Sequence, residues 1–240
     1  MLESLLRGVR QLGIVLTPDQ VRQFQLYYEE LVSWNTRVNL TAITDYEEVQ
    51  TRHFLDSLTV ITVLNNQPRA EGDFSLIDVG TGGGIPGIPL KIVLKQARAV
   101  LLDSVAKKTA FVQHAVTALG LDRTEVVTGR AEALAHHPLY RQSFDLALCR
   151  AVSKLATIAE LTLPFLRHGG LAIISKKGDI QQELTQAGRA IETLGGRTKE
   201  VRRIDLEGLE GHCLVVLEKA AATPPRFPRR AGMPEKRPIL

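Results

Sequence analysis

Short apolar runs alternate with segments of helical periodicity through most of this 240-residue chain. Apolar runs of four to six residues, bounded by glycine or polar turns, are typical of buried parallel strands. They predict strands at residues 76–79, 99–103, 125–128, 144–149 and 171–175. Apolar residues spaced three or four apart predict the intervening helices, at residues 88–95, 105–119, 155–166 and 180–194. The pattern therefore predicts an α/β domain with a mostly parallel sheet.

Both ends of the chain depart from this alternation. Residues 197–204 and 212–218 are predicted to be a final strand pair, antiparallel because only a glycine-bearing loop joins them. Ahead of the first strand, helical spacing covers residues 2–12, 18–34 and 46–64. We therefore expect a helical N-terminal extension at residues 1–72, a sheet domain at 73–220 and a proline-rich tail at 221–240.

A glycine cluster, GTGGGIPG at residues 80–87, directly follows the first strand. Glycines allow a sharp turn with positive φ and let a ligand approach the main chain. The helix that follows offers free N–H groups at its N-terminus. Asp103 ends the next strand, where a carboxylate can accept hydrogen bonds from two ribose hydroxyls. These features predict a site for a nucleoside-bearing cofactor at the carboxyl edge of the sheet.

The spacing of the glycines narrows the choice of cofactor. A dinucleotide fingerprint requires glycine at the sixth position, where Ile85 stands, and no P-loop motif is present. The run from Asp78 to Gly84 instead resembles the first motif of S-adenosylmethionine-dependent methyltransferases. The whole arrangement is similar to their class I, Rossmann-like fold, a mostly parallel sheet with a final antiparallel strand. A purely structural turn is the alternative interpretation of the loop.

Composition supports a cytoplasmic protein with no membrane partner. The N-terminus lacks the features of a signal peptide, and no apolar stretch approaches the roughly 20 residues of a bilayer span. Cys149 and Cys213 indicate neither a disulfide framework nor a metal site.

The formal net charge of +4 is concentrated at the C-terminus. Residues 223–240 carry five basic side chains, one acidic side chain and five prolines, so this segment accounts for the whole excess. We expect an extended basic arm that lies along a polyanion such as RNA. Its deletion is expected to weaken RNA binding and to leave cofactor affinity unchanged. A solvated tail without a partner is the alternative.

Six motifs, taken in order, carry a more specific resemblance. They are residues 35–41 (NTRVNLT), 52–58 (RHFLDSL), 78–87 (DVGTGGGIPG), 129–132 (GRAE), 150–152 (RAV) and 177–178 (KG). Together they resemble the GidB/RsmG family of bacterial 16S ribosomal RNA guanine-N7 methyltransferases, over roughly residues 5–219. The resemblance implies S-adenosylmethionine as cofactor, 16S rRNA or the small-subunit particle as partner, no metal, and a monomer.

The resemblance also implies roles for individual residues. The cofactor would contact Gly80, Ile85, Asp103, Ser104, Val105, Ala131, Glu132 and Arg150. Position 85 is commonly Phe in the family, and Ile85 can cover a cofactor by apolar contact but cannot stack on it. Arg150 and Lys177 are the candidate catalytic residues, as donors to guanine O6 or to phosphate. Guanine N7 has an in-plane lone pair, so the reaction needs positioning and charge complementarity rather than a base.

The N-terminal motifs lie outside the cofactor loops. Asn39, His53 and Asp56 are therefore expected to serve the RNA or the mouth of the active site. His53 and Asp56 share a helix face, and Arg52 is spaced to pair with Asp56. A surface ion pair without a functional role is the alternative.

Two other functions remain open from the sequence. One is a nicotinamide-dependent oxidoreductase, against which the missing sixth-position glycine argues. The other is an RNA-binding module without catalysis, against which the intact glycine loop and Asp103 argue. Thermal shifts with S-adenosylmethionine, S-adenosylhomocysteine and NAD would separate the three.

Overall fold

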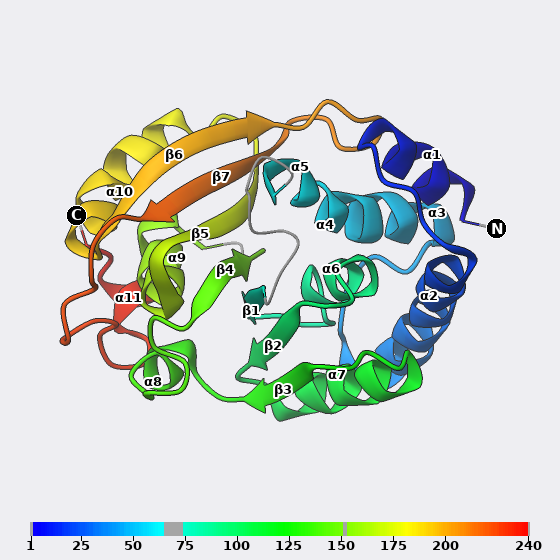
Figure 1. Ribbon diagram of the computed structural model, residues 1–240, viewed down its shortest axis with the longest axis horizontal. Coiled ribbons are helices and arrows are strands. Elements are labelled where there is room, and N and C mark those ends of the chain that lie inside the picture. The colour runs from blue at the N-terminus through cyan, green and yellow to red at the C-terminus, as the bar shows by residue number, and fades with distance from the viewer. Residues whose placement is uncertain (1, 65–73, 151–152, 240) are drawn as a thin grey trace.

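The computed structural model describes residues 2–64, 74–150 and 153–239, and a seven-stranded sheet lies at its centre (Figure 1). The strand order is β3-β2-β1-β4-β5-β7-β6; β7 runs antiparallel to β5 and β6, and the other neighbouring pairs are parallel. The strands are β1 (Ser75–Val79), β2 (Arg98–Asp103), β3 (Thr124–Thr128), β4 (Phe144–Cys149), β5 (Leu166–Lys177), β6 (Gly196–Arg203) and β7 (His212–Lys219). The predicted class I sheet with its antiparallel final pair is confirmed.

Helices cover both faces of this sheet because side chains of each strand alternate between the two sides. Leu76 and Leu101 pack in one apolar cluster with α1 (Glu3–Gln11), α2 (Pro18–Val38), α6 (Gly87–Val93) and α7 (Ala106–Ala118). Ile77 and Val100 pack on the other side with α9 (Leu155–Thr162) and α10 (Gln181–Thr193). The N-terminal helices thus share one core with the sheet. No helix in the described ranges is long and apolar enough to cross a membrane.

The N-terminal helix α2 begins where the sequence predicts and ends later. Thr17 and Gln20 form a reciprocal capping box, with Pro18 in the first turn. The helix continues through the expected breaker at Asn35 and ends at Val38. Asn35 does not break it because its Oδ1 accepts from the backbone N–H groups of Leu40 and Thr41, at 2.6 and 2.9 Å, and so holds the chain beyond the helix end.

The helix predicted at residues 46–64 is divided. It consists of α3 (Tyr46–Val49), a π-helical turn η1 (Gln50–Leu55), α4 (Asp56–Leu58) and α5 (Ile61–Leu64). Single π-helical turns are frequent at functional sites because they redirect side chains. This turn carries Arg52 and His53.

The C-terminal residues 223–239 fold back onto the body beside α9 instead of extending as an arm (Figure 1). Phe227 is buried in the second apolar cluster, and the short helix α11 spans Met233–Lys236. Arg229 forms an ion pair with Glu160, a fully buried carboxylate on α9. The expectation of a free extended arm is wrong because Glu160 offers this cation a buried partner.

Candidate active site

The glycine loop lies between the carboxyl ends of β1 and β2. The N–H groups of Gly80 and Thr81 donate to the Leu102 carbonyl at 2.8 and 2.9 Å. Gly80 has a φ of 77°, and a Cβ placed on it would meet open space. Its main chain is therefore accessible to a ligand, as the sequence predicts.

Asp78 shapes this loop from beneath. Its Oδ2 accepts from Thr81 Oγ1 at 2.6 Å and from the Gly87 N–H at 2.9 Å. Its Oδ1 is buried without a hydrogen-bond partner among the described residues. Burial raises the pKa of Asp78 to about 7, although the two hydrogen bonds act in the opposite direction. The side chain thus fixes both ends of the glycine loop and is buried beneath the ligand-facing surface.

Asp103 fastens the loop to the start of α7. Its Oδ2 accepts from the Gly82 N–H and its Oδ1 from the Val105 N–H, both at 2.9 Å. Each carboxylate oxygen keeps lone-pair capacity beyond these bonds. Asp103 is therefore held in one orientation and can still accept from ligand hydroxyls.

A cavity of about 230 Å³ opens beside this loop. Five of the residues predicted to bind cofactor line it: Gly80, Asp103, Ser104, Ala131 and Glu132. These five residues therefore share one cavity at the carboxyl edge of the sheet, where the family resemblance implies the cofactor. Ile85 and Val105 are not among its lining residues; Ile85 packs against the N-terminal core, and Val105 is 43% exposed.

The cavity lining also includes residues that the sequence did not suggest. Thr157, Ile158 and Leu161 come from α9, and Gly232 and Pro234 come from the C-terminal segment. The Gly232 N–H donates to Glu132 Oε1 at 2.8 Å. The composition of the segment predicted an extended basic arm and did not reveal where the segment packs.

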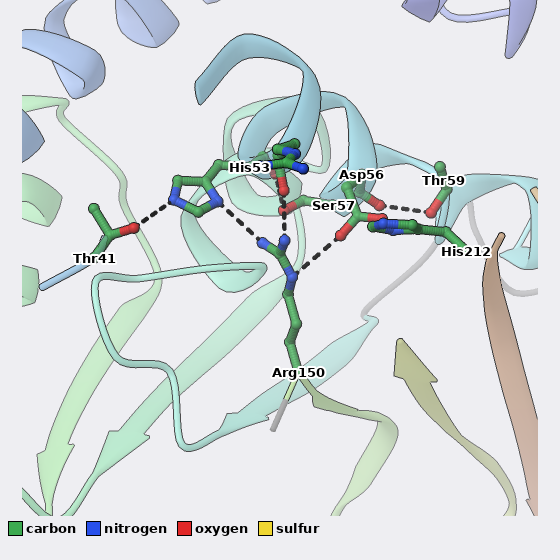
Figure 2. Close-up of polar contacts among 8 residues, drawn as sticks. Thr41, His53, Asp56, Ser57, Thr59, Arg150 and His212 are labelled. Carbon is green, nitrogen blue, oxygen red and sulfur yellow. Dashed lines mark hydrogen bonds and ion pairs between the residues drawn. The ribbon is translucent and has the colours of Figure 1, made fainter. Parts of the chain in front are cut away.

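Arg150, the residue after β4, joins the sheet to the N-terminal helices (Figure 2). Its Nε lies 3.1 Å from Asp56 Oδ2, its Nη1 lies 3.3 Å from His53 Nδ1, and its Nη2 donates to the Arg52 carbonyl. His212 Nδ1 lies 2.9 Å from the other Asp56 oxygen. Three of the predicted functional residues, His53, Asp56 and Arg150, thus form one buried polar network.

The ring of His53 is neutral and its tautomer follows from its neighbours. Burial lowers the pKa of His53 to about 4, and the positive charge of Arg150 acts in the same direction. Arg150 has only donors, so His53 Nδ1 must accept from it. The proton is then on Nε2, which donates to Thr41 Oγ1 at 2.8 Å.

The remaining predictions about this region have mixed outcomes. The suggested pair of Arg52 with Asp56 is wrong: Arg52 pairs with Glu48 at 2.9 Å, because Arg150 and His212 occupy the Asp56 carboxylate. Lys177 is exposed at the end of β5, in register with His212, and so lies at the edge of the network. Asn39 is exposed at the C-terminal end of α2, with a φ of 47°.

We expect the lowered pKa of His53 to make folding stability depend on pH. The unfolded ring takes up a proton near pH 6.5, whereas the folded ring resists it down to about pH 4. The contribution of neutral His53 to the free energy of unfolding is fully present above pH 6.5. It is lost as pH falls toward 4, by about 3 kcal/mol in total. Chemical denaturation of the wild type and His53→Gln across this range measures it.

Comparing wild type with His53→Gln isolates the contribution of His53 to stability. The comparison is needed because Asp78, whose pKa is raised, changes stability in the opposite direction over the same pH range. His53→Gln keeps an acceptor for Arg150 and a donor for Thr41 but has no titrating ring. His168→Gln, at an exposed position on β5, is the control and should follow the wild type. Parallel stability curves for wild type and His53→Gln would contradict the assignment.

Comparison with known sequences places the chain among ribosomal RNA methyltransferases. Residues 20–209 match the sequence model of a family described as rRNA small subunit methyltransferase G. A protein named ribosomal RNA small subunit methyltransferase G from Dehalococcoides mccartyi is 46% identical over 240 residues, and the match covers 100% of both chains. A protein of the same name from Roseiflexus sp. (strain RS-1) is 44% identical over 238 residues, covering 99% of this chain and 100% of the relative.

Solved structures agree at the level of the fold. A SAM-dependent methyltransferase from Aquifex aeolicus matches with a TM-score of 0.51 at 18% identity, covering 74% of this chain and 94% of that one. The fibrillarin pre-rRNA processing protein of Methanococcus jannaschii matches with a TM-score of 0.50 at 13% identity, covering 63% and 69%. At such identities the likeness concerns the class I fold alone.

Proposed function

Because this chain belongs to the rRNA small subunit methyltransferase G family, we propose that it methylates N7 of a guanine in 16S ribosomal RNA, using S-adenosylmethionine. The observation that carries the proposal in the structure is the cavity shared by Gly80, Asp103 and Glu132. Family membership also argues against the nicotinamide-dependent alternative. The enzyme is proposed to act in the cytoplasm as a monomer.

The residues around the cavity suit a nucleoside cofactor. Gly80 presents accessible main chain, and the carboxylates of Asp103 and Glu132 offer acceptors to ribose hydroxyls and to the adenine amino group. Ser104 and Ala131 would flank the adenosine, with Ile85 and Val105 further out. Arg150 would meet the methionine end, since Cys149 directly before it lines the cavity. S-adenosylmethionine, when bound, supplies an electrophilic methyl group.

The protein's part in the reaction is orientation. Guanine N7 attacks through its own lone pair, so no side chain has to remove a proton from it. Contacts with the described residues use three of the five guanidinium N–H groups of Arg150, and the other two could serve a ligand. We assign these donors and Lys177 to guanine O6 or to phosphate.

The N-terminal residues are proposed to act on RNA through Arg150. His53 and Asp56 hold the guanidinium in place, and exposed Asn39 is available at the surface. In this division of labour the sheet loops bind cofactor, whereas the helical extension positions the base. Extrusion of the target guanine from its stack would bring it to Arg150.

A labelling assay tests the proposed reaction. The protein is incubated with methyl-labelled S-adenosylmethionine and either small-subunit particles or naked 16S rRNA, from cells that lack this modification. Chain cleavage at N7-methylguanine then maps the product. Label at one guanine supports the proposal, and the better substrate identifies the partner. Cofactor binding without any methylation would favour the RNA-binding module that has lost catalysis.

We expect the exposed cations of the C-terminal segment to contribute to RNA affinity. Arg226, Arg230, Lys236 and Arg237 are exposed, whereas Arg229 is committed to Glu160. Replacing the four by Gln should lower the slope of log affinity against log salt by at most about 3, because each phosphate contact contributes about 0.7 on single strands. Arg22→Gln, at an exposed site on α2, is the control. Overlapping slopes for the quadruple variant and wild type would show that these cations are only solvated.

A further inference from the structure

The C-terminal segment reaches the proposed cofactor site from the far end of the chain. Gly232 and Pro234 line the same cavity as Asp103 and Glu132. The bond from the Gly232 N–H to Glu132 Oε1 joins residues 100 positions apart. It occupies one of the two carboxylate oxygens of Glu132, and among the residues that the structure describes no hydrogen bond occupies the other, which could accept from a ligand.

An ion pair holds this segment against the body. Arg229 donates from its backbone N–H and from Nε to Glu160 Oε1, at 2.8 and 2.9 Å, and from Nη2 to Oε2. Glu160 is fully buried on α9, so Arg229 neutralises a charge that water cannot reach. Because the Arg229 side chain donates to both Glu160 oxygens and its backbone N–H donates to one of them, these bonds fix the chain direction at residue 229.

Further contacts fix the chain on either side of this ion pair. The Arg141 guanidinium donates to the carbonyls of Thr223 and Phe227, each at 2.9 Å. Thr157 Oγ1, on the same helix as Glu160, donates to the Pro234 carbonyl at 2.9 Å. Gly232 therefore lies between two anchors on α9, three residues after Arg229 and two before Pro234.

We propose that residues 229–235 form the adenine wall of the cofactor pocket, and that Arg229 and Glu160 position Gly232 so that its N–H orients the Glu132 carboxylate toward the adenine amino group. The inference rests on the proposed cofactor site. It replaces the expectation that this segment has no bearing on cofactor affinity. Arg229 and Glu160 are positioning residues, since they reach the cofactor only through Gly232 and Glu132.

The test compares two ligands that differ at one group. S-adenosylhomocysteine carries a 6-amino donor, whereas S-inosylhomocysteine carries a carbonyl acceptor that a carboxylate repels. Calorimetry on wild type should give at least about tenfold tighter binding of the adenosyl ligand, as expected for loss of a charge-assisted hydrogen bond.

The variant Glu160→Gln/Arg229→Gln removes the ion pair without leaving a buried charge unpaired. It should bind S-adenosylhomocysteine about tenfold more weakly and S-inosylhomocysteine almost as wild type does, so the preference nearly disappears. Arg189→Gln, an exposed cation on α10 outside the proposed wall, is the matched control and should keep the full preference.

Three outcomes overturn the proposal. Equal weakening of both ligands in the double variant would mean that the segment only supports the fold. A wild type that binds both ligands equally would mean that Glu132 does not read the amino group, while the cofactor site itself stands. A wild type that binds neither would remove the proposed cofactor site as well.

A second measurement does not depend on the variant folding. Amide hydrogen exchange of the intact wild-type chain is followed with and without S-adenosylhomocysteine. The ligand should slow exchange across residues 229–236 as well as in the glycine loop. Slowing at the loop with no change at residues 229–236 would place the ligand away from this wall and refute the proposal.

Discussion

Arg150→Ala should lower methyl transfer by about 100-fold or more, the effect of losing two charge-assisted hydrogen bonds at the target base or cofactor. The same change leaves Asp56, which is 2% exposed, with only His212 as an ionic partner among the described residues. Removing one member of a buried ion pair costs about 3–5 kcal/mol of folding stability. Single-turnover kinetics and chemical denaturation measure the two effects separately.

Two further variants separate the loss of activity in Arg150→Ala from its loss of folding stability. Arg150→Lys keeps a cation beside Asp56 but cannot bridge Asp56, His53 and the Arg52 carbonyl together, so stability should largely return while activity stays low. Arg52→Ala breaks only the exposed pair with Glu48 and should change stability by no more than about 0.5 kcal/mol. Full activity in folded Arg150→Ala would exclude Arg150 from the reaction.

Asp103→Ala should raise the dissociation constant for S-adenosylmethionine by at least about ten- to a hundredfold, since the loss of even one charge-assisted bond to a ribose hydroxyl costs about 1.5–3 kcal/mol. The substitution also frees the N–H groups of Gly82 and Val105, so the glycine loop loses its tie to α7. Titration calorimetry on the folded variant measures the change.

The choice of controls separates ribose binding from loop geometry. Asp103→Asn keeps one acceptor oxygen and should bind cofactor with intermediate affinity. Asp122→Ala removes an exposed carboxylate beyond the opposite end of α7 and should bind as wild type does. Unchanged affinity in folded Asp103→Ala would rule out a ribose-binding role for this carboxylate.

Local sequence determined the strands and helices of the sheet domain and the part of the candidate site formed by the glycine loop and Asp103. Short continuous apolar runs and 3.6-residue spacing are properties of short segments, so these elements could be predicted. The glycine loop and Asp103 lie within one strand-helix-strand unit, and adjoining parallel strands bring their carboxyl ends together. The glycine loop and Asp103 could be assigned to a cofactor site for that reason, whereas the roles of Ser104, Ala131 and Glu132 were implied by the family resemblance.

Tertiary packing decided which charges meet. Arg52 lies only four residues before Asp56 on the helix, yet Asp56 pairs with Arg150 and His212. These two partners follow β4 and begin β7, and the Asp56 side chain is buried against them directly after the π-helical segment. Composition marked residues 223–240 as basic and proline-rich, which favours an extended arm. Only the fold shows that buried Glu160 is available to Arg229.

The sequence by itself thus determined the class I sheet, the cofactor loop and, through its motifs, the family. These follow from local periodicity and from residues that lie close together in the chain. The structure alone decided how Arg150 is held and where the C-terminal segment lies, because those contacts join residues as far as 100 positions apart. Contacts at such separation depend on which buried groups remain unpaired after the core has packed, and no local pattern records that.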